Sequence, residues 1–571
     1  MPRNVYIETF GCQMNELDSE LVSGQLRALG YRFVPEADAA DVVLYNTCSV
    51  REHAEQKVWS RLGELAVRKR EEPALVVGVL GCLAERDGEA LVKRMPVVDI
   101  LCGPGELDKL PGLLDNAVRT RESLMSDVGC RTSDVGEEKT GREPLVSARQ
   151  VALQGSASRR SATLAAAGDS LELLDLSRSI SAVDEHDAAK RSAYVRITRG
   201  CNKFCTYCVV PFTRGAEVHR PPQHIIDECK RLADAGVIEV TLLGQTVNHY
   251  RFEHGAAVTV NGLTQPQKGR TYAGGHSRDP FAGANTTTFA ELLARIHDEV
   301  PAIRRLRFVT SYPRDFGNDV LEVMRDHPRI CRYLHVPGQS GSDRILKLMN
   351  RGYTVSEYVE FLDRARSYLH QPEINRPLMI SGDFIIGFPT ETDEDFEGTV
   401  ALVKRARYKN SFIFKYSARP GTVAIDKYPD DVPESVKRER NGRLLALQGA
   451  ISEEISREQV GETLEVFVEG LSPRERKKRA RAQAPHHSHG TVSLTIRGLS
   501  ADEGDDSCCS VSPAEEVVEA GAPQLRGRTD GDLIVLFDVP QGRAAESLVG
   551  EMVRVKITGA SGLSCFGDVV G

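Results

Sequence analysis

Short apolar runs alternate with helix-like segments over the first part of the chain. Residues 5–10, 41–47 and 74–81 are brief apolar runs bounded by turn residues, as strands are. The segments between them repeat apolar residues at helical spacing. Strands that alternate with helices predict a parallel sheet with right-handed crossovers. We therefore expect an α/β domain over residues 1–118.

The same alternation returns further along the chain and predicts a second α/β domain. Six strands share the pattern: residues 193–198, 238–244, 305–310, 332–338, 381–387 and 412–417. Because helical segments separate most of them, we expect a partial (β/α)6 barrel over residues 192–450. A stretch rich in Gly, His and Thr, residues 250–288, interrupts it and is expected to be a surface excursion.

The last region, residues 451–571, alternates apolar and polar residues as half-buried strands do. Its candidate strands are residues 461–470, 531–539 and 550–560. Glycines separate them, which predicts a small OB-like β-barrel. A charged insertion, residues 473–525, splits this region and contains the basic run RERKKRAR at 474–481. Such a run is as compatible with a solvated loop as with phosphate binding.

Length and composition fit a folded protein of several domains. The 571 residues predict about three domains, and residues 119–191, rich in Ser, Gly, Ala and charge, predict a disordered linker. The formal net charge of −8 excludes a uniformly basic nucleic-acid binder but not a local basic patch. No apolar run reaches the roughly 18 residues of a membrane helix, and no secretory or transit pattern opens the chain. We expect a cytoplasmic protein with no membrane partner.

Thirteen cysteines indicate metal or redox chemistry rather than disulfides in a reducing compartment. Cys201, Cys205 and Cys208, the central triad, follow a predicted barrel strand with C-x3-C-x2-C spacing. Their loop therefore lies at the carboxyl end of a strand, where such folds have their active sites. Three thiolates suit an iron–sulfur cluster and leave one iron without a protein ligand. A zinc knuckle is the alternative, but its next candidate ligand, His219, is poorly placed.

Three more cysteines each follow a predicted strand of the first domain. Cys12, Cys48 and Cys82, the N-terminal triad, are separated by 36 and 34 residues, about one β/α unit each. Because the carboxyl ends of parallel strands share one edge, these thiols are expected to line one crevice and hold a second cluster. The alternative is three buried small hydrophobic residues. A core cysteine would lie inside the strand, however, rather than in the turn after it.

The segments that carry these patterns resemble the methylthiotransferase family of radical S-adenosylmethionine (SAM) enzymes. They cover most of the chain outside the insertions: ETFGCQMNELDSE, YNTCSVRE, VLGCLAE, TRGCNKFCTYCVVPFTRG, LLGQTVNHY, HVPGQSGSDRILKLMNRGYT, DFIIGFPTETDEDF and FKYSARPGT. QMN at 13–15 and SVRE at 49–52 resemble the branch that modifies isopentenylated adenosine in tRNA. GRTDGDLIVLFD resembles the TRAM domain, a small RNA-binding barrel.

The resemblance implies a mechanism with two 4Fe-4S clusters. A cluster on the central triad would bind SAM and cleave it to a 5′-deoxyadenosyl radical, which removes hydrogen from carbon 2 of the target adenine. A cluster on the N-terminal triad would hold the sulfur that another SAM molecule methylates before transfer. Because the cofactors carry the hard steps, we assign no general base.

The resemblance also nominates residues around SAM and RNA. Tyr207, inside the cysteine loop, resembles the aromatic residue that shields the adenine of SAM, with ordinary packing as the alternative. Five residues at strand ends are candidate SAM contacts, with turn chemistry as the alternative: Gly244, Gln245, Gln339, Ser340 and Gly387. Arg528 matches the barrel motif and is a candidate RNA contact, with pairing to Asp530 or Asp532 as the alternative.

The function that the resemblance implies is addition of a methylthio group to carbon 2 of N6-isopentenyladenosine at position 37 of tRNA. The partners would be the anticodon stem-loop of tRNA and a low-potential electron donor such as flavodoxin or ferredoxin, and the protein would be a monomer. Two alternatives remain: the sister activity on threonylcarbamoyladenosine, and a non-catalytic iron–sulfur redox sensor that binds RNA. Residues 215–219 (GAEVH) depart from the arginine- and serine-rich family pattern, which leaves the substrate contacts of that loop open.

Overall fold

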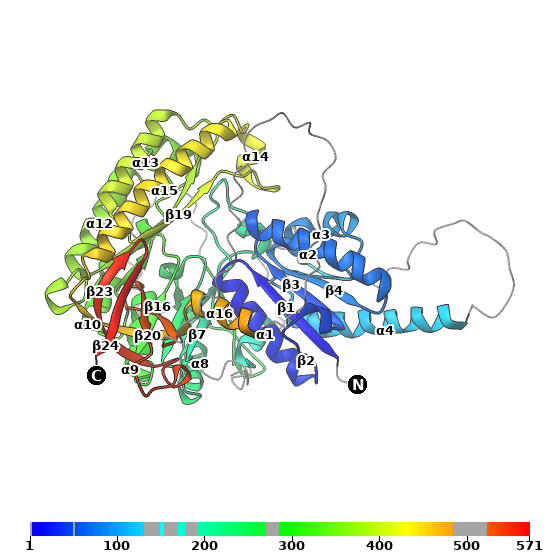
Figure 1. The fold of residues 1–571 in the computed structure, drawn as a ribbon. Coiled ribbons are helices and arrows are strands. Elements are labelled where there is room, and N and C mark those ends of the chain that lie inside the picture. Colours follow the sequence, from blue (N-terminus) through cyan, green and yellow to red (C-terminus); the bar gives the residue numbers. More distant parts are fainter. Residues whose placement is uncertain are drawn as a thin grey trace, which may run out of the picture.

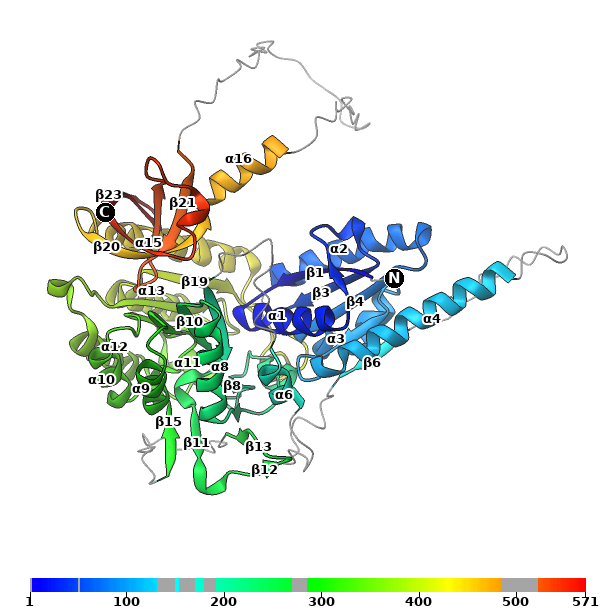
Figure 2. The ribbon, with the colours of Figure 1, turned by 90° about the horizontal axis from the view of Figure 1, so that it is seen from below.

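The computed structural model describes seven stretches of the chain: residues 3–49, 52–130, 149–153, 170–178, 191–269, 285–483 and 522–570. They form an N-terminal α/β domain, a central partial barrel and a C-terminal β-barrel. Figure 1 shows the N-terminal domain beside the central domain, and Figure 2 shows the C-terminal barrel against another side of the central domain. Within these stretches, no helix is both long and apolar enough to cross a membrane.

The N-terminal domain is a parallel sheet with strand order β2-β1-β3-β4-β5-β6. Its strands are β1 (Asn4–Phe10), β2 (Arg32–Phe33), β3 (Val42–Thr47), β4 (Val76–Gly81), β5 (Ile100–Cys102) and β6 (Gln150–Ala152). Its main helices are α1 (Gln13–Ala28), α2 (Glu52–Glu71), α3 (Cys82–Arg94) and α4 (Leu110–Cys130). β3 and β4 are buried along their whole length, as central parallel strands between helical layers are. The predicted α/β sheet is confirmed.

Three pieces of the predicted disordered linker, residues 119–191, are ordered. α4 continues to Cys130, and β6 adds an edge strand to the sheet. α6 (Ser170–Leu176) packs Leu171 and Leu174 into the apolar core of the N-terminal domain. The sequence pattern missed α6 because its few leucines are diluted by the surrounding Ser, Ala and charge. The rest of the linker lies outside the described residues.

The central domain has the six parallel strands that the sequence predicts. They are β7 (Ser192–Arg196), β10 (Glu239–Leu243), β16 (Arg305–Phe308), β17 (Tyr333–His335), β18 (Met379–Ile386) and β19 (Asn410–Lys415). β7, β10 and β16 form one half and β17, β18 and β19 the other, and a bridge between Leu306 and Ile330 joins the halves. The outer helices include α8 (Pro222–Asp234), α9 (Phe289–Glu299), α10 (Asn318–Asp326), α12 (Val355–Leu369), α13 (Asp393–Ala406) and α15 (Glu434–Arg457).

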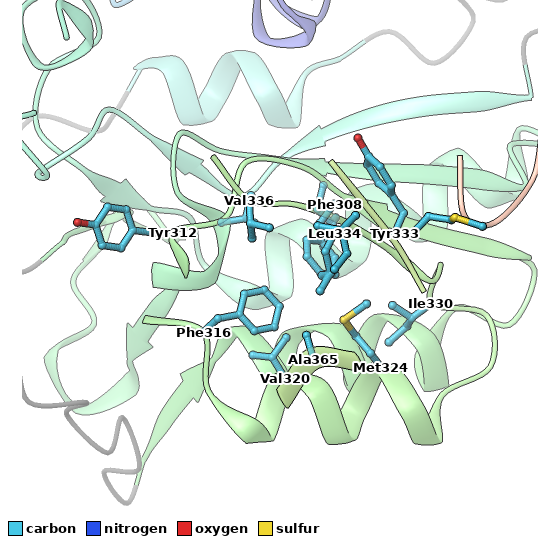
Figure 3. Close-up of a cluster of buried hydrophobic side chains, with 14 of the residues drawn as sticks. Phe308, Tyr312, Phe316, Val320, Met324, Ile330, Tyr333, Leu334, Val336 and Ala365 are labelled. Atoms are coloured by element: carbon cyan, nitrogen blue, oxygen red, sulfur yellow. The ribbon is translucent and has the colours of Figure 1, made fainter. Parts of the chain in front are cut away.

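The largest apolar core lies between these strands and the outer helices. Figure 3 shows Phe308 and Leu334 above Phe316 and above two residues of α10, Val320 and Met324. The ring centroids of Phe308 and Phe316 are 6.4 Å apart. Because alternate residues of a strand face opposite sides, the residues between these apolar ones face the inside of the barrel. The inner face is therefore free to carry polar groups and the reaction site.

The stretch predicted to be a surface excursion, residues 250–288, in part covers the central domain. Its strand β14 (Gln267–Lys268) pairs with β9 (Val218–His219), which pairs with β8 (Thr198–Arg199). The Asn202 amide donates to the carbonyl of Gly269 over 3.1 Å, which ties this stretch to the loop of the central triad. Strands of two residues have no periodicity, so the sequence pattern could not reveal them.

The C-terminal domain is a closed barrel with strand order β20-β21-β22-β24-β23. Its strands are β20 (Thr463–Leu471), β21 (Gln524–Arg528), β22 (Ile534–Asp538), β23 (Met552–Ser561) and β24 (Ser564–Val570). This confirms the small β-barrel that the alternating pattern predicts. The charged insertion begins as a helix, α16 (Pro473–Gln483), and residues 484–521 lie outside the described part.

The turn between β21 and β22 docks the C-terminal barrel on the amino ends of the central strands. Asp532 in this turn is buried against Arg307 of β16 and lies 2.6 Å from Lys409 Nζ and 2.8 Å from Arg528 Nη1. Lys409 directly precedes β19, and Arg305, the first residue of β16, donates to carbonyls of the turn. Burial alone would raise the pKa of Asp532, but the three cations hold it well below its usual range. This contact closes the barrel end opposite the cysteine loop.

Buried ion pairs join the N-terminal domain to the central domain. Arg196 of β7 lies 3.1 Å from Asp18 of α1 and 2.6 Å from Asp175 of α6. Arg220, which follows β9, lies 2.9 Å from Glu172 of α6. Removing one partner of such a pair leaves a buried charge without compensation, so these contacts fix how the domains meet.

Acid is expected to weaken this junction through Glu172. Burial alone would raise the pKa of Glu172, but Arg220 and His224 lower it from 4.5 to about 2. A carboxyl whose folded pKa is depressed stabilises the fold fully above the unfolded pKa and loses that effect as pH falls toward the folded value. Glu172→Gln removes the titrating group, so the stability difference between wild type and variant should shrink between pH 5 and pH 3. Thermal unfolding across this range measures it, and a difference that stays constant would contradict the assignment.

Candidate active site

Three neighbouring strands end side by side and place the N-terminal triad. Phe10, the last residue of β1, is paired with Thr47 of β3, and Thr47 is paired with Gly81 of β4. Each cysteine of the triad follows one of these residues by one or two positions. The three thiols therefore start from one edge of the sheet.

The turns that carry these cysteines pack closely against one another, which explains the glycines and asparagines beside the cysteines. Gly11 has a φ of +147°, and a Cβ on it would lie 2.5 Å from Cys48 Cβ. Gly81 has a φ of +85°, and a Cβ on it would lie 2.4 Å from Asn46 Oδ1. Asn15 Nδ2 donates to Asn46 Oδ1, and Asn46 Nδ2 donates to the Asn15 carbonyl, each over 2.9 Å. These two asparagines, which sequence reasoning did not assign, hold the three turns together.

The surroundings of Cys12 favour its thiolate form. Cys12 precedes α1, and the backbone N–H groups of Met14 and Asn15 at the start of that helix donate to its sulfur. A hydrogen bond with Cys48 is the main cause that lowers the pKa of Cys12 to about 6, and the Arg214 guanidinium adds to it. Burial raises the pKa of Cys82, although Arg214 opposes this. One arginine thus lies near two of the three sulfurs.

The central triad lies in the loop that follows β8. The Cys208 N–H donates to the Cys205 carbonyl over 3.0 Å and folds the loop back on itself. Arg351 Nη1 lies 3.4 Å from Cys205 Sγ. Burial and then the Glu217 carboxylate raise the pKa of Cys201 to about 12. Because metal ligands must be deprotonated, a bound cationic centre is what would make these thiols thiolates.

Aromatic rings hold Arg351 against this triad. Its guanidinium lies 4.6 Å from the ring centroid of Tyr312 and 5.1 Å from that of Tyr353. Its Nε also donates to the Tyr353 hydroxyl over 3.0 Å. An arginine fixed in this way offsets negative charge on the Cys205 sulfur.

The two triads open on the same domain junction. Helix α7 (Val210–Thr213) begins two residues after Cys208 and contacts α3, whose first residue is Cys82. Arg214, which ends α7, pairs with Asp18 of α1 over 2.9 Å. The Thr213 hydroxyl and the Arg214 guanidinium are both neighbours of Cys82. Figures 1 and 2 show α1 against the central domain, at the boundary where these contacts lie.

The donor set of each triad suits an iron–sulfur cluster better than a structural zinc ion. Each triad offers three thiols, one fewer than the four ligands of a structural zinc ion. A structural zinc site brings four ligands close together around one ion, with Zn–S distances of about 2.3 Å. A 4Fe-4S cluster binds each cysteine sulfur through a separate iron, so three cysteines can hold it and leave one iron without a protein ligand. The donor set of each triad therefore fits three corners of such a cluster.

Candidate SAM contacts lie on both sides of the central triad. Gly244 and Gln245 follow β10 and directly precede Thr246, whose hydroxyl lies 3.8 Å from Cys201 Sγ. Tyr207 lies inside the cysteine loop and packs against a small apolar cluster around α11 (Asp343–Leu348). The end of β10 and the cluster around α11 therefore both adjoin the cysteine loop.

The other three candidates make mainly structural contacts. Gln339 has a φ of +67°, and its backbone N–H and C=O both bond to β18. Ser340 is fully buried, and its hydroxyl lies 3.5 Å from Thr399 of α13. A Cβ on Gly387 would lie 2.4 Å from Lys437 Cγ. The Ser340 side chain is thus directed to α13 and is not brought to the central triad.

The candidate RNA contact, Arg528, is engaged within the chain. Its Nε lies 2.7 Å from Glu469, and its Nη1 lies 2.8 Å from Asp532. Pairing with Asp532 is the alternative that the sequence left open. Two carboxylates therefore already offset the charge of this guanidinium.

Comparison with known proteins defines the class of this site. Residues 4–103 match the family described as "Uncharacterized protein family UPF0004", and residues 195–403 match the radical SAM superfamily. The second match runs from within β7 through β18 and includes the whole cysteine loop. The protein is a radical SAM enzyme.

Within that class, the chain belongs to the family of tRNA-2-methylthio-N(6)-dimethylallyladenosine synthases. The member from Rhodopirellula baltica is 38% identical over 573 residues, which cover 100% of this chain and 96% of that protein. The member from Porphyromonas gingivalis is 34% identical, over 100% of this chain and 95% of that protein. Among solved structures, the radical SAM methyltransferase TsrM from Kitasatospora setae has 16% identity, 74% coverage of each chain and a TM-score of 0.42, too distant to inform the site. The resemblance that the motifs predicted is confirmed, with SAM and iron–sulfur clusters as cofactors.

Proposed function

We propose that this chain adds a methylthio group to carbon 2 of N6-isopentenyladenosine at position 37 of tRNA. The observation that carries the proposal is the opening of two thiol triads on one domain junction, through the contact of α7 with α3. Its relatives from Rhodopirellula baltica and Porphyromonas gingivalis are named for the corresponding tRNA product. A protein with one redox-sensing cluster would not need two triads on facing domain edges.

In this proposal each triad has its own task. The central triad would hold the cluster whose chemistry generates the radical from SAM, and the N-terminal triad would hold the cluster that bears the sulfur to be transferred. The chain positions both, since Asn15 and Asn46 fix the turns of one triad and the folded loop fixes the other. Arg214 and Arg351 each place one positive charge beside one of the two triads. The buried ion pairs of the junction keep the two edges facing each other.

SAM would lie over the carboxyl ends of the central strands. The Gln245 amide can donate to the SAM carboxylate, and Gly244, Gln339 and Gly387 would lie along the edge of the SAM site at their strand ends. Tyr207 would lie against that adenine. We further propose a cytoplasmic monomer that receives its electron from flavodoxin or ferredoxin, because the reductive cleavage of SAM requires a low-potential donor.

Mass spectrometry of tRNA nucleosides from cells that lack the gene tests this function. We expect the methylthio form of isopentenyladenosine to disappear and unthiolated isopentenyladenosine to accumulate. Wild-type protein should restore the product. A change confined to threonylcarbamoyladenosine would instead identify the sister activity. A protein that forms no 5′-deoxyadenosine from SAM after anaerobic cluster reconstitution would instead be a redox sensor.

A further inference from the structure

The C-terminal barrel carries a basic helix whose charges are largely uncompensated. The sequence of α16, PRERKKRARAQ, has six arginines or lysines and one glutamate. Arg474, Arg476, Lys477 and Lys478 are exposed. No carboxylate of the described residues lies within 4.0 Å of their charged groups. This differs from Arg528, whose charge is offset by two carboxylates.

Other residues hold α16 in place. The Glu475 N–H donates to the Ser472 hydroxyl over 3.2 Å at the start of the helix. Arg479 pairs with Glu546 at 3.4 Å, which ties the helix to the loop before β23. The four exposed cations have no such part in the fold. Arg474, Lys477 and Lys478 are spaced i, i+3 and i+4, so they share one face and repel each other, a repulsion that a polyanion would relieve.

The position of α16 suits a long polyanionic partner. Figure 2 shows the helix extending from the C-terminal barrel on the side that faces the N-terminal domain. The N-terminal domain carries one of the two triads at its sheet edge. An RNA whose target base enters the junction would therefore have α16 beside another part of its backbone.

We propose that α16 is a phosphate-binding arm for the tRNA substrate, in which Arg474, Arg476, Lys477 and Lys478 contact backbone phosphates. The proposal rests on the proposed function only for the identity of the RNA. Such contacts give affinity through counterion release and carry no base specificity. A local source of positive charge matters here because the whole chain has a net charge of −8.

Fluorescence anisotropy tests the proposal by measuring the affinity of the full-length reconstituted enzyme for an unmodified tRNA transcript. The measurement is repeated at several salt concentrations. The variant replaces Arg474, Arg476, Lys477 and Lys478 with Gln, which keeps helix propensity. Its affinity should fall by about tenfold or more at physiological salt, and the slope of log K against log salt should decrease in magnitude by about 3. With tRNA as substrate, KM should rise while kcat and the cleavage of SAM without tRNA stay unchanged.

A matched pair of double variants separates α16 from general surface charge. Lys477→Gln/Lys478→Gln should weaken binding, whereas Arg554→Gln/Lys556→Gln, two exposed charges on β23 of the same barrel, should change it less than about twofold. Equal losses in both pairs would overturn the proposal in favour of diffuse attraction. Unchanged affinity and salt slope in the fourfold variant would overturn it outright. If tRNA binding depends on α16 while the nucleoside product differs, only the proposed base specificity fails.

Discussion

Replacing Cys12 by alanine should separate the two halves of the reaction. The central triad is unchanged in this variant, so anaerobically reconstituted enzyme should still convert SAM to 5′-deoxyadenosine. Methylthio transfer should fall below about 1% of wild type, because the sulfur-supplying site has lost a ligand and the cofactor carries that step. Both products can be measured in one assay by liquid chromatography and mass spectrometry.

Two further cysteine variants serve as controls for this result. Cys201→Ala should lose 5′-deoxyadenosine and methylthio product together. Cys229, which is fully buried on α8 in the apolar core, is a cysteine outside both triads, so Cys229→Ala should keep both activities at a stability cost of about 1 kcal/mol. A Cys12→Ala enzyme that cleaves no SAM while its central cluster is present would contradict separate tasks for the triads.

The largest effect on stability is expected from Asp532→Asn. The substitution leaves Arg307, Lys409 and Arg528 buried or half-buried without their shared carboxylate. Breaking a buried pair in this way costs about 3–5 kcal/mol. We expect a lower unfolding temperature and faster proteolysis between the central domain and the C-terminal barrel.

Asp530→Asn is the matched control for Asp532→Asn. Asp530 lies two residues away in the same turn, and its partly exposed carboxylate is 3.5 Å from Arg376. A pair of this kind contributes about 1 kcal/mol or less. Equal stability of the two variants would show that the turn does not dock the C-terminal barrel.

The sequence was sufficient to predict the strands and the two triads, because the cysteines follow apolar runs that can be recognised from a few neighbouring residues. It could not predict the residues that complete the site, since their partners are distant in the chain. Arg351 lies 146 residues from Cys205, and Arg214 lies 196 residues from Asp18. Neither arginine stands out by composition or periodicity. Only the folded junction shows what each one faces.

On the C-terminal barrel, motif resemblance directed attention to Arg528 and away from the exposed charges of α16. Arg528 belongs to a recognisable motif, but its guanidinium pairs with Glu469, 59 residues away, and with Asp532. The basic run at 474–481 has no motif and was equally compatible with a solvated loop. Arg528 and the basic run differ in whether carboxylates lie beside their charges. Which carboxylates do so is decided by strand pairing and by the docking of the C-terminal barrel, not by the local sequence.

Counting iron and acid-labile sulfide in the reconstituted protein tests most directly whether each triad holds its own cluster. Wild type should contain about eight irons and eight sulfides per chain, and Cys12→Ala and Cys201→Ala should each retain about half of both. Complete loss in both variants would mean one shared site, and full retention in either would mean that its triad holds no cluster.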